Sequence, residues 1–158
     1  MPNDAFDSLF DAWGQALNVN PQITKTIFHI ESSGGKNTGR SLPDDADSPV
    51  GPMQMRPSTA AALAKRIGIE GPLNLQDMRF AVPLATAYVA EGLNATQSAE
   101  GAFGYYFAGP DRSKWGPKTA AYAQHGVALY PSMALKVPAP AESKPAQLAS
   151  ADTAQDQP

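Results

Sequence analysis

Hydrophobic residues recur every three or four positions along much of the chain, which is the spacing of amphipathic helices. The first helix predicted in this way carries its apolar face on Phe6, Leu9, Phe10, Trp13 and Leu17. A second helix is predicted from Asn20 and Pro21, because asparagine is a favoured N-cap and proline fits the first helical turn. The glycine pair at 34–35 ends this helix at about Ser32.

Four more helices are expected, at about 57–67, 75–93, 99–107 and 117–130. Pro83 lies inside the range 75–93, and we expect a kink or a broken start there because proline has no backbone N–H to donate. No alternating hydrophobic pattern of useful length indicates a β-sheet. The sequence therefore predicts a mainly α fold.

The stretch 36–56 interrupts the helical pattern with a long polar loop. It is rich in proline, aspartate and glycine, and a loop of this length in a compact domain is often functional. The loop has room for a small hairpin, whose position the sequence does not fix.

Bulk composition adds several exclusions. The chain has 158 residues, of which 42% are hydrophobic and 17% charged, enough for one hydrophobic core. Its net charge of -3 gives no sign of nucleic-acid binding. It has no cysteine and only two histidines, so we expect neither a metal site nor an organic cofactor.

The composition of the chain changes after Lys136. Residues 137–158 are rich in proline, alanine, serine and glutamine and lack aromatic residues. This composition predicts a disordered tail or linker after a single folded domain at 1–136.

The N-terminal residues lack the basic and apolar segments of a secretory signal, and no run approaches the roughly 18 apolar residues of a membrane span. We expect neither.

Glu31 is the first candidate for chemistry. At about 100° per residue it lies about 40° from Ile27, at the border of the apolar stripe formed with Ile23 and Ile30. Partial burial would raise its pKa and let it donate a proton near neutral pH, as general acid catalysis on a glycosidic oxygen requires. A glutamate at a helix end can also simply pair with a lysine or arginine, and periodicity leaves both interpretations open.

Other polar residues suggest a sugar-like substrate. Asp44, Asp45 and Asp47 could supply the second carboxylate that two-carboxylate glycosidases use, although loop acids are more often only solvated. Gln54 lies between two methionines just after Gly51, which suits the wall of a sugar site. These residues do not decide the mechanism by themselves.

Four ordered blocks within residues 31–127 resemble the lytic transglycosylase domain of the soluble lytic transglycosylase family, which has a lysozyme-like fold. The family's Glu-Ser, Ser-x-x-Gly-Leu-Met-Gln and Thr-Ala elements resemble residues 31–32, 48–54 and 59–60. Its Asn-Leu and Ala-Tyr-Leu elements resemble 74–75 and 87–89. Its Ala-Tyr-Asn-Ala-Gly-Pro block with a downstream tryptophan resembles 105–110 and Trp115, and its closing tyrosine pattern has a counterpart at 122–127.

The resemblance implies a lysozyme-like helical domain whose Glu31 is the single catalytic acid/base of a peptidoglycan lytic transglycosylase. Glu31 would protonate the leaving oxygen of the β-1,4 bond between N-acetylmuramic acid and N-acetylglucosamine. It would then deprotonate the muramoyl C6 hydroxyl, giving a 1,6-anhydro end. The resemblance assigns Ser48, Met53, Gln54 and Tyr106 to substrate binding, with Ser48 ordering the loop behind the acid and Tyr106 hydrogen-bonding near Glu31.

Two departures from the family pattern keep alternatives open. Pro52 replaces a leucine, and Phe107 replaces an asparagine and so removes a polar contact. One alternative is a hydrolytic muramidase that pairs Glu31 with a loop aspartate. The other is a catalytically weak, glycan-binding structural component.

The expected partner is the glycan strand of periplasmic or cell-wall peptidoglycan. Because no signal peptide is expected, the sequence favours a virion-associated or machine-delivered enzyme that locally opens the wall for a phage or a secretion machine, or a protein exported by a non-standard route. The tail at 137–158 could tether it to structural proteins of such an assembly.

Overall fold

The computed structural model describes residues 2–137, and within that range the fold is helical, as predicted. The elements are α1 (Asp7–Leu17), α2 (Pro21–Ser32), α3 (Pro57–Ile67), α4 (Met78–Thr96), α5 (Ala99–Ala108), η1 (Arg112–Lys114), α6 (Pro117–Leu129) and η2 (Tyr130–Ser132). No helix among the described residues is long and apolar enough to cross a membrane. The predicted tail at 137–158 lies outside the described residues except for Val137, so the domain boundary stays a prediction.

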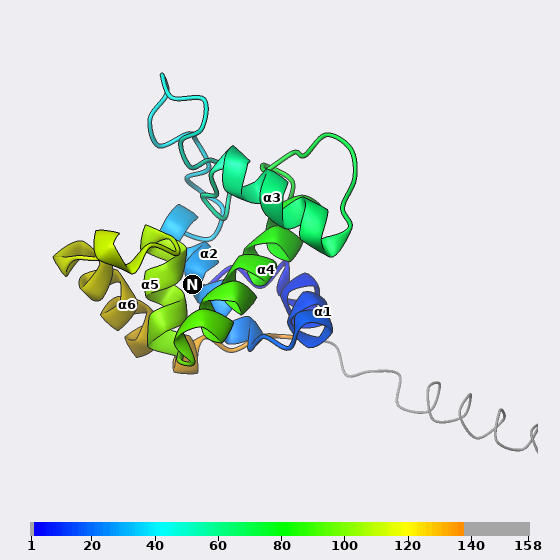
Figure 1. The fold of residues 1–158 in the computed structure, drawn as a ribbon. Coiled ribbons are helices and arrows are strands. Elements are labelled where there is room, and N and C mark those ends of the chain that lie inside the picture. The colour runs from blue at the N-terminus through cyan, green and yellow to red at the C-terminus, as the bar shows by residue number, and fades with distance from the viewer. Residues whose placement is uncertain (1, 138–158) are drawn as a thin grey trace, which may run out of the picture.

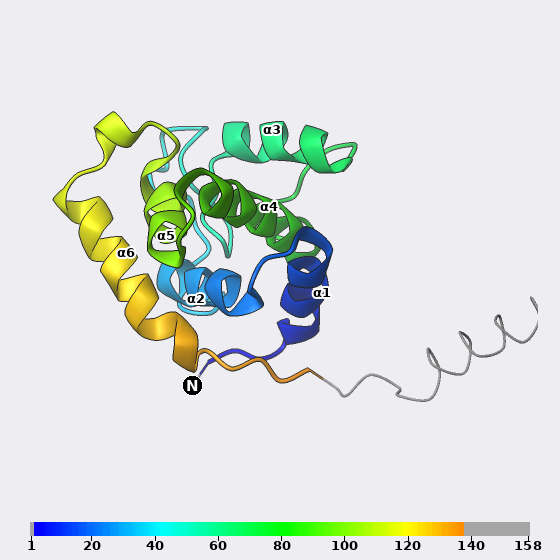
Figure 2. The same ribbon diagram turned by 60° about the horizontal axis from the view of Figure 1, so that its bottom comes forward.

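Helix α4 forms the centre of the domain, and α1, α2, α3 and α5 all contact it. Figures 1 and 2 show α3 on one side of α4 and α1 and α2 on the other, with α6 packed outside α5. The central position requires a helix that is apolar on several faces. In α4 the side chains of Ala81, Val82, Leu84, Ala85 and Val89 are all at most 1% exposed.

The start of α4 differs from the prediction. The helix begins at Met78 rather than near Leu75, because the Asp77 carboxylate accepts a hydrogen bond from the Arg79 N–H and caps it there. Of the kink or broken start expected at Pro83, the broken start is absent, since the helix continues through this residue. Pro83 lies in the second turn, where its missing N–H removes a single hydrogen bond.

The loop 36–56 contains the predicted hairpin in its smallest form. Val50 and Met55 exchange backbone hydrogen bonds of 3.1 and 3.2 Å. Gly51 begins the turn at φ +86°, and a Cβ there would lie 2.1 Å from the Leu75 carbonyl oxygen. Only glycine fits this position, so the hairpin is held tightly against the segment before α4.

Helix α2 carries a fully buried lysine that joins both terminal segments. The Lys25 ammonium donates to Asp4 at 2.8 Å, to Asp7 at 2.9 Å and to the Ala134 carbonyl at 2.8 Å. The Lys136 N–H also donates to Asp7 at 2.6 Å. We refer to these five residues as the Lys25 cluster. All three ammonium donors have a partner, which offsets the cost of burying the charge.

Candidate active site

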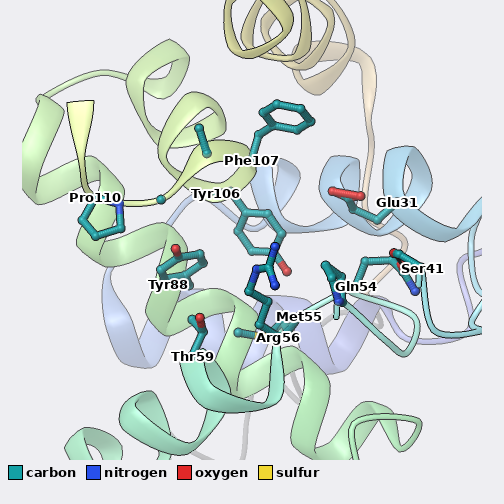
Figure 3. A pocket seen from close by; sticks show the side chains of 13 residues that line it. Glu31, Ser41, Gln54, Met55, Arg56, Thr59, Tyr88, Tyr106, Phe107 and Pro110 are labelled. Atoms are coloured by element: carbon teal, nitrogen blue, oxygen red, sulfur yellow. Dashed lines mark hydrogen bonds between the residues drawn. The ribbon is translucent and has the colours of Figure 1, made fainter. Parts of the chain in front are cut away.

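A cleft of about 460 Å³ lies where the end of α2, the hairpin, the start of α3, α4 and the end of α5 meet (Figure 3). Its walls are polar on the hairpin side and aromatic on the side of α4 and α5. The lining residues are Glu31, Ser41, Pro49, Gln54, Met55, Arg56, Thr59, Tyr88, Tyr106, Phe107, Ala108, Gly109 and Pro110.

Glu31 reaches this cleft from the last turn of α2, and Figure 3 shows its carboxylate directed toward the cavity. The Tyr122 hydroxyl, on α6, donates a hydrogen bond of 2.9 Å to Glu31 Oε2. Burial raises the pKa of Glu31, and the Tyr122 hydrogen bond opposes part of that rise. The group is therefore biased toward its protonated form and has one fixed donor for the carboxylate that proton loss creates.

Among residues 2–137, Glu31 is the lone carboxylate that lines the cleft. Asp44 and Asp45 are exposed on the loop. The Asp47 carboxylate caps α3 by accepting from the Ser58 N–H at 2.7 Å and the Ser58 hydroxyl at 2.6 Å. These hydrogen bonds lower the pKa of Asp47, so this residue is a structural anion outside the cleft.

Gln54, a predicted substrate contact, does line the cleft, but its amide is largely engaged within the protein. Its Nε2 donates to the carbonyls of Gly39 and Gly51, each at 2.9 Å, and its Oε1 accepts from the Ser41 hydroxyl at 2.7 Å. Its backbone φ of 47° is left-handed, a conformation that costs a non-glycine residue roughly 1–2 kcal/mol. Gln54 thus fixes the shape of the hairpin wall.

Ser48 and Met53, also predicted substrate contacts, lie behind the cleft wall. Ser48 is fully buried, and its hydroxyl pairs with the N–H and carbonyl of Leu42 at 3.1 and 3.0 Å. This agrees with the loop-ordering role expected for it. Met53 is 1% exposed and its side chain belongs to the hydrophobic core. Internal hydrogen bonds occupy the Ser48 hydroxyl and packing occupies the Met53 side chain, and a substrate contact of either residue stays a prediction.

Two tyrosines stand near Glu31, and Tyr106 is the one expected to hydrogen-bond there. Tyr106 lines the cleft with its ring, but its hydroxyl donates to the Met53 carbonyl at 2.7 Å. The hydrogen bond to Glu31 comes from Tyr122. Burial is the main cause that raises the pKa of both tyrosines well above 10, so both stay protonated donors at neutral pH.

Several lining residues were not identified as site residues from the sequence. The Tyr88 ring lies 5.3 Å from the rings of both Tyr105 and Tyr106. Phe107 is 46% exposed and packs against Tyr122 at 4.8 Å between ring centroids. Tyr88 and Tyr122 stand inside the family-like blocks, which could have identified them. Arg56 had no such signal.

Comparison with known proteins places this geometry in a family. The sequence matches the Transglycosylase SLT domain over residues 8–125. No curated protein sequence matches the chain. The 70-kDa soluble lytic transglycosylase from Escherichia coli is similar in structure, with a TM-score of 0.70 and 20% identity over 84% of this chain and 24% of that one.

Two further solved structures show the same likeness. A complex of the 70-kDa soluble lytic transglycosylase with bulgecin A has a TM-score of 0.67 and 19% identity over 80% of this chain and 23% of that one. An inactive glutamate-to-glutamine variant of lytic transglycosylase Slt from Pseudomonas aeruginosa has a TM-score of 0.68 and 18% identity over 84% and 24%. The chain spans about a quarter of the length of these proteins. Since the family match covers most of the chain and includes the cleft from Glu31 to Tyr122, this protein belongs to the Transglycosylase SLT domain family.

Proposed function

We propose that this protein is a peptidoglycan lytic transglycosylase that cleaves the β-1,4 bond between N-acetylmuramic acid and N-acetylglucosamine without water. The observation that carries the proposal is Glu31, a carboxylate with a raised pKa and a tyrosine partner in a cleft with no second carboxylate among the described residues. Membership of the Transglycosylase SLT domain family supports the same activity.

Glu31 acts first as general acid and then as general base. In its protonated form it gives its proton to the glycosidic oxygen as the bond to the muramoyl anomeric carbon breaks, and N-acetylglucosamine leaves as an alcohol. The substrate's own acetamido group stabilises the positive charge at that carbon. The Glu31 carboxylate then takes the proton of the muramoyl C6 hydroxyl, whose oxygen bonds to the anomeric carbon and closes the 1,6-anhydro ring.

Both steps suit the surroundings of Glu31. Burial favours the protonated form that starts the reaction, and the Tyr122 hydroxyl stabilises the carboxylate that follows proton transfer. The ring closure is intramolecular, so holding the sugar in place supplies much of the rate. The aromatic wall of Tyr88, Tyr106 and Phe107 offers a surface on which a pyranose ring can rest.

A hydrolytic muramidase that uses a loop aspartate receives no support from the geometry. Glycosidases with two carboxylates place them on either side of the scissile bond. Asp44, Asp45 and Asp47 do not line the cleft, and Asp47 is engaged by Ser58. We therefore take the transglycosylase as the proposed activity.

Mass spectrometry of the products tests this proposal. Purified peptidoglycan is incubated with the wild-type protein or with Glu31→Gln, which keeps the size of the side chain and removes the acid. Muropeptides ending in 1,6-anhydromuramic acid are expected from the wild type alone. Reducing ends, which contain one more water, would identify a hydrolase. Binding to glycan strands with no product from the wild type would instead support the binding component.

Bulgecin A offers a second, simpler test of the cleft. The structurally similar 70-kDa soluble lytic transglycosylase forms a complex with this molecule. We propose that this cleft also binds bulgecin A, which should raise the thermal unfolding temperature of the wild-type protein. A Phe107→Asp variant, with a charge on the aromatic wall, should lose most of that shift.

The cellular role is a proposal of its own. We propose that the enzyme opens the cell wall locally for a phage particle or a secretion machine, to which the segment beyond Lys136 attaches it. The test compares the full chain with a chain truncated after Lys136. The full chain should remain bound when the phage particle or secretion machine is purified, and the truncated chain should be lost. Equal retention of both would contradict attachment through that segment.

A further inference from the structure

The cleft carries a cation whose purpose the proposed acid/base chemistry leaves unexplained. Of the lining residues, Glu31 and Arg56 are the two with acidic or basic side chains. Glu31 is biased toward its neutral form by burial. Arginine carries a permanent positive charge, and Arg56 is the one basic side chain that lines the cleft.

Arg56 has few partners within the protein. It is exposed, and its Nη1 donates a single hydrogen bond, of 3.2 Å, to the backbone carbonyl of Asp47. No carboxylate of residues 2–137 lies within ion-pair distance of its guanidinium. A guanidinium has five N–H donors in a planar fork, and most of those of Arg56 are free to bind a ligand.

The position of Arg56 directs these donors into the cleft. The residue immediately precedes α3, and Figure 3 shows its side chain extending into the cavity in front of Tyr106, between Gln54 and Tyr88. Ser58 holds the Asp47 carboxylate through two hydrogen bonds, and these, with a smaller contribution from the Arg56 charge, lower the pKa of Asp47. The guanidinium therefore lines the cleft with no carboxylate of residues 2–137 paired to it.

Arg56 is not a counter-ion for the catalytic acid. The two side chains form no ion pair, and the hydrogen-bond partner of the Glu31 carboxylate is the Tyr122 hydroxyl. Both residues line the same cleft, so a glycan strand bound there can meet the acid and the guanidinium at different points.

Anionic groups of the substrate are confined to one place. The sugar rings of peptidoglycan are neutral, and the N-acetylmuramoyl residue alone carries a lactyl ether with a carboxyl group. This carboxylate is free in strands without peptide. In peptide-bearing strands it forms an amide, and the stem peptide supplies carboxylates of its own. Arginine binds carboxylates through two parallel hydrogen bonds that also fix their orientation.

We propose that Arg56 binds a carboxylate carried by the lactyl or peptide substituent of an N-acetylmuramoyl residue, and so determines which glycan strands this protein accepts. The inference rests on the proposed function, because it requires peptidoglycan in the cleft. It assigns to Arg56 a role in substrate choice that is separate from the chemistry at Glu31.

Binding to an inactive protein tests the proposal without requiring catalysis. Three soluble N-acetylglucosamine–N-acetylmuramic acid oligosaccharides serve as probes, with the lactyl group as a free acid, as its methyl amide, or joined to L-Ala-D-Glu. Their dissociation constants are measured for Glu31→Gln alone and for Glu31→Gln combined with Arg56→Gln. Glu31→Gln with Lys65→Gln is the matched control, because Lys65 lies on α3 outside the cleft.

With Arg56 present, at least one of the two anionic probes should bind about 10-fold more tightly than the methyl amide, the size expected for a hydrogen bond to a charged group. Arg56→Gln should abolish this preference, so that the three probes bind with similar dissociation constants. Lys65→Gln should preserve it. Preference for the free acid would point to peptide-free strands, and preference for the dipeptide to peptide-bearing ones. Equal binding of all three probes, or a preference that survives Arg56→Gln, would overturn the proposal.

Kinetics on the active protein separates this inference from the proposed function. If Arg56 sets substrate choice, Arg56→Gln should lower kcat/KM for the favoured anionic probe about 10-fold more than for the methyl amide. Loss of activity on all three probes alike would contradict the proposal and show that Arg56 maintains the site itself. A wild-type protein that binds the probes with the expected preference but cleaves none of them would contradict the transglycosylase activity alone.

Discussion

Helix α2 buries two charged residues, and their surroundings differ. Lys25, in the first half of the helix, is fully buried and has three partners, two of them carboxylates. Glu31, near the end of the same helix, is partly buried and has one partner, a neutral hydroxyl. The first charge is compensated by its neighbours, and the second is not.

This difference separates a structural charge from a chemical one. A compensated buried charge holds segments together and gains nothing from changing its protonation state. Burial without a compensating charge destabilises the ionised form of the Glu31 carboxyl group and so raises its pKa. The proton is then retained to higher pH, where it is available for transfer. One helix thus anchors the terminal segments at Lys25 and carries the proposed acid/base at Glu31.

Removal of the Glu31 charge should give the largest effect of all: it should lower activity and raise stability at neutral pH. Glu31→Gln should lower the cleavage rate by at least ~10²–10⁴-fold, the usual contribution of a general acid/base. The raised pKa means that ionisation of Glu31 opposes folding as the pH rises above the ordinary value of 4.5. The variant should therefore unfold at a higher temperature than wild type at pH 7 and at a similar one below pH 4.5. An equal or lower unfolding temperature at pH 7 would contradict this account.

Removal of the compensated charge should act on stability. Lys25→Met leaves Asp7, which is 1% exposed, without its ammonium partner, and breaking a buried ion pair typically costs about 3–5 kcal/mol. Urea unfolding measures the loss. The double variant Lys25→Met, Asp7→Leu should recover part of it. A loss below about 1 kcal/mol for the single variant would show that the Lys25 cluster contributes little.

The Tyr122 hydrogen bond should have a smaller effect, visible in the pH profile. Glu31 must be protonated to start the reaction, so kcat/KM should fall as the pH rises through its pKa. Tyr122 lowers that pKa, and Tyr122→Phe should therefore move the fall to higher pH. The best rate should drop about 3–10-fold, the value of one hydrogen bond. The control variant Tyr130→Phe, outside the cleft, should change neither the pH profile nor the best rate. An unshifted profile for Tyr122→Phe would argue that Tyr122 does not lower the pKa of Glu31.

The smallest expected effect concerns the exposed edge of the Lys25 cluster. Hydrogen bonds from Lys25 and Lys136 lower the pKa of Asp4 from 3.8 to about 2. Its contribution to stability is therefore fully present above pH 3.8 and lost as the pH falls through about 2. Asp4→Asn should unfold at a lower temperature than wild type at pH 7, and the difference should disappear near pH 2. A difference that does not depend on pH would exclude the ionised carboxylate as its cause.

Local sequence signals identified the helices well. The caps Asn20 and Pro21 fixed the start of α2, and hydrophobic periodicity placed Glu31 beside a buried stripe. The start of α4 was missed by about one turn, because Asp77 caps that helix and the hydrophobic pattern extends beyond it. Signals within a few residues of each other therefore decided where helices lie, and capping decided their ends.

The site depended on contacts that local signals do not contain. Tyr122 meets Glu31 across 91 positions of sequence, and Ser48 and Met53 are buried rather than among the cleft-lining residues. Arg56, which directly follows the Val50–Met55 bridge, does line the cleft. A motif can indicate that such residues matter, but the tertiary fold decides which side chains reach the cavity.

The Lys25 cluster also has a mechanical consequence. Residues 4–7 and 134–136 bind the same lysine on α2, so a pulling force applied through the two ends would meet these ionic contacts before it reached the hairpin or the cleft. The terminal segments would detach first, while α2 to α5 kept their packing. If one end of the molecule were anchored while the cleft held a glycan strand, the tension would fall on the Lys25 cluster and not on the cleft around Glu31.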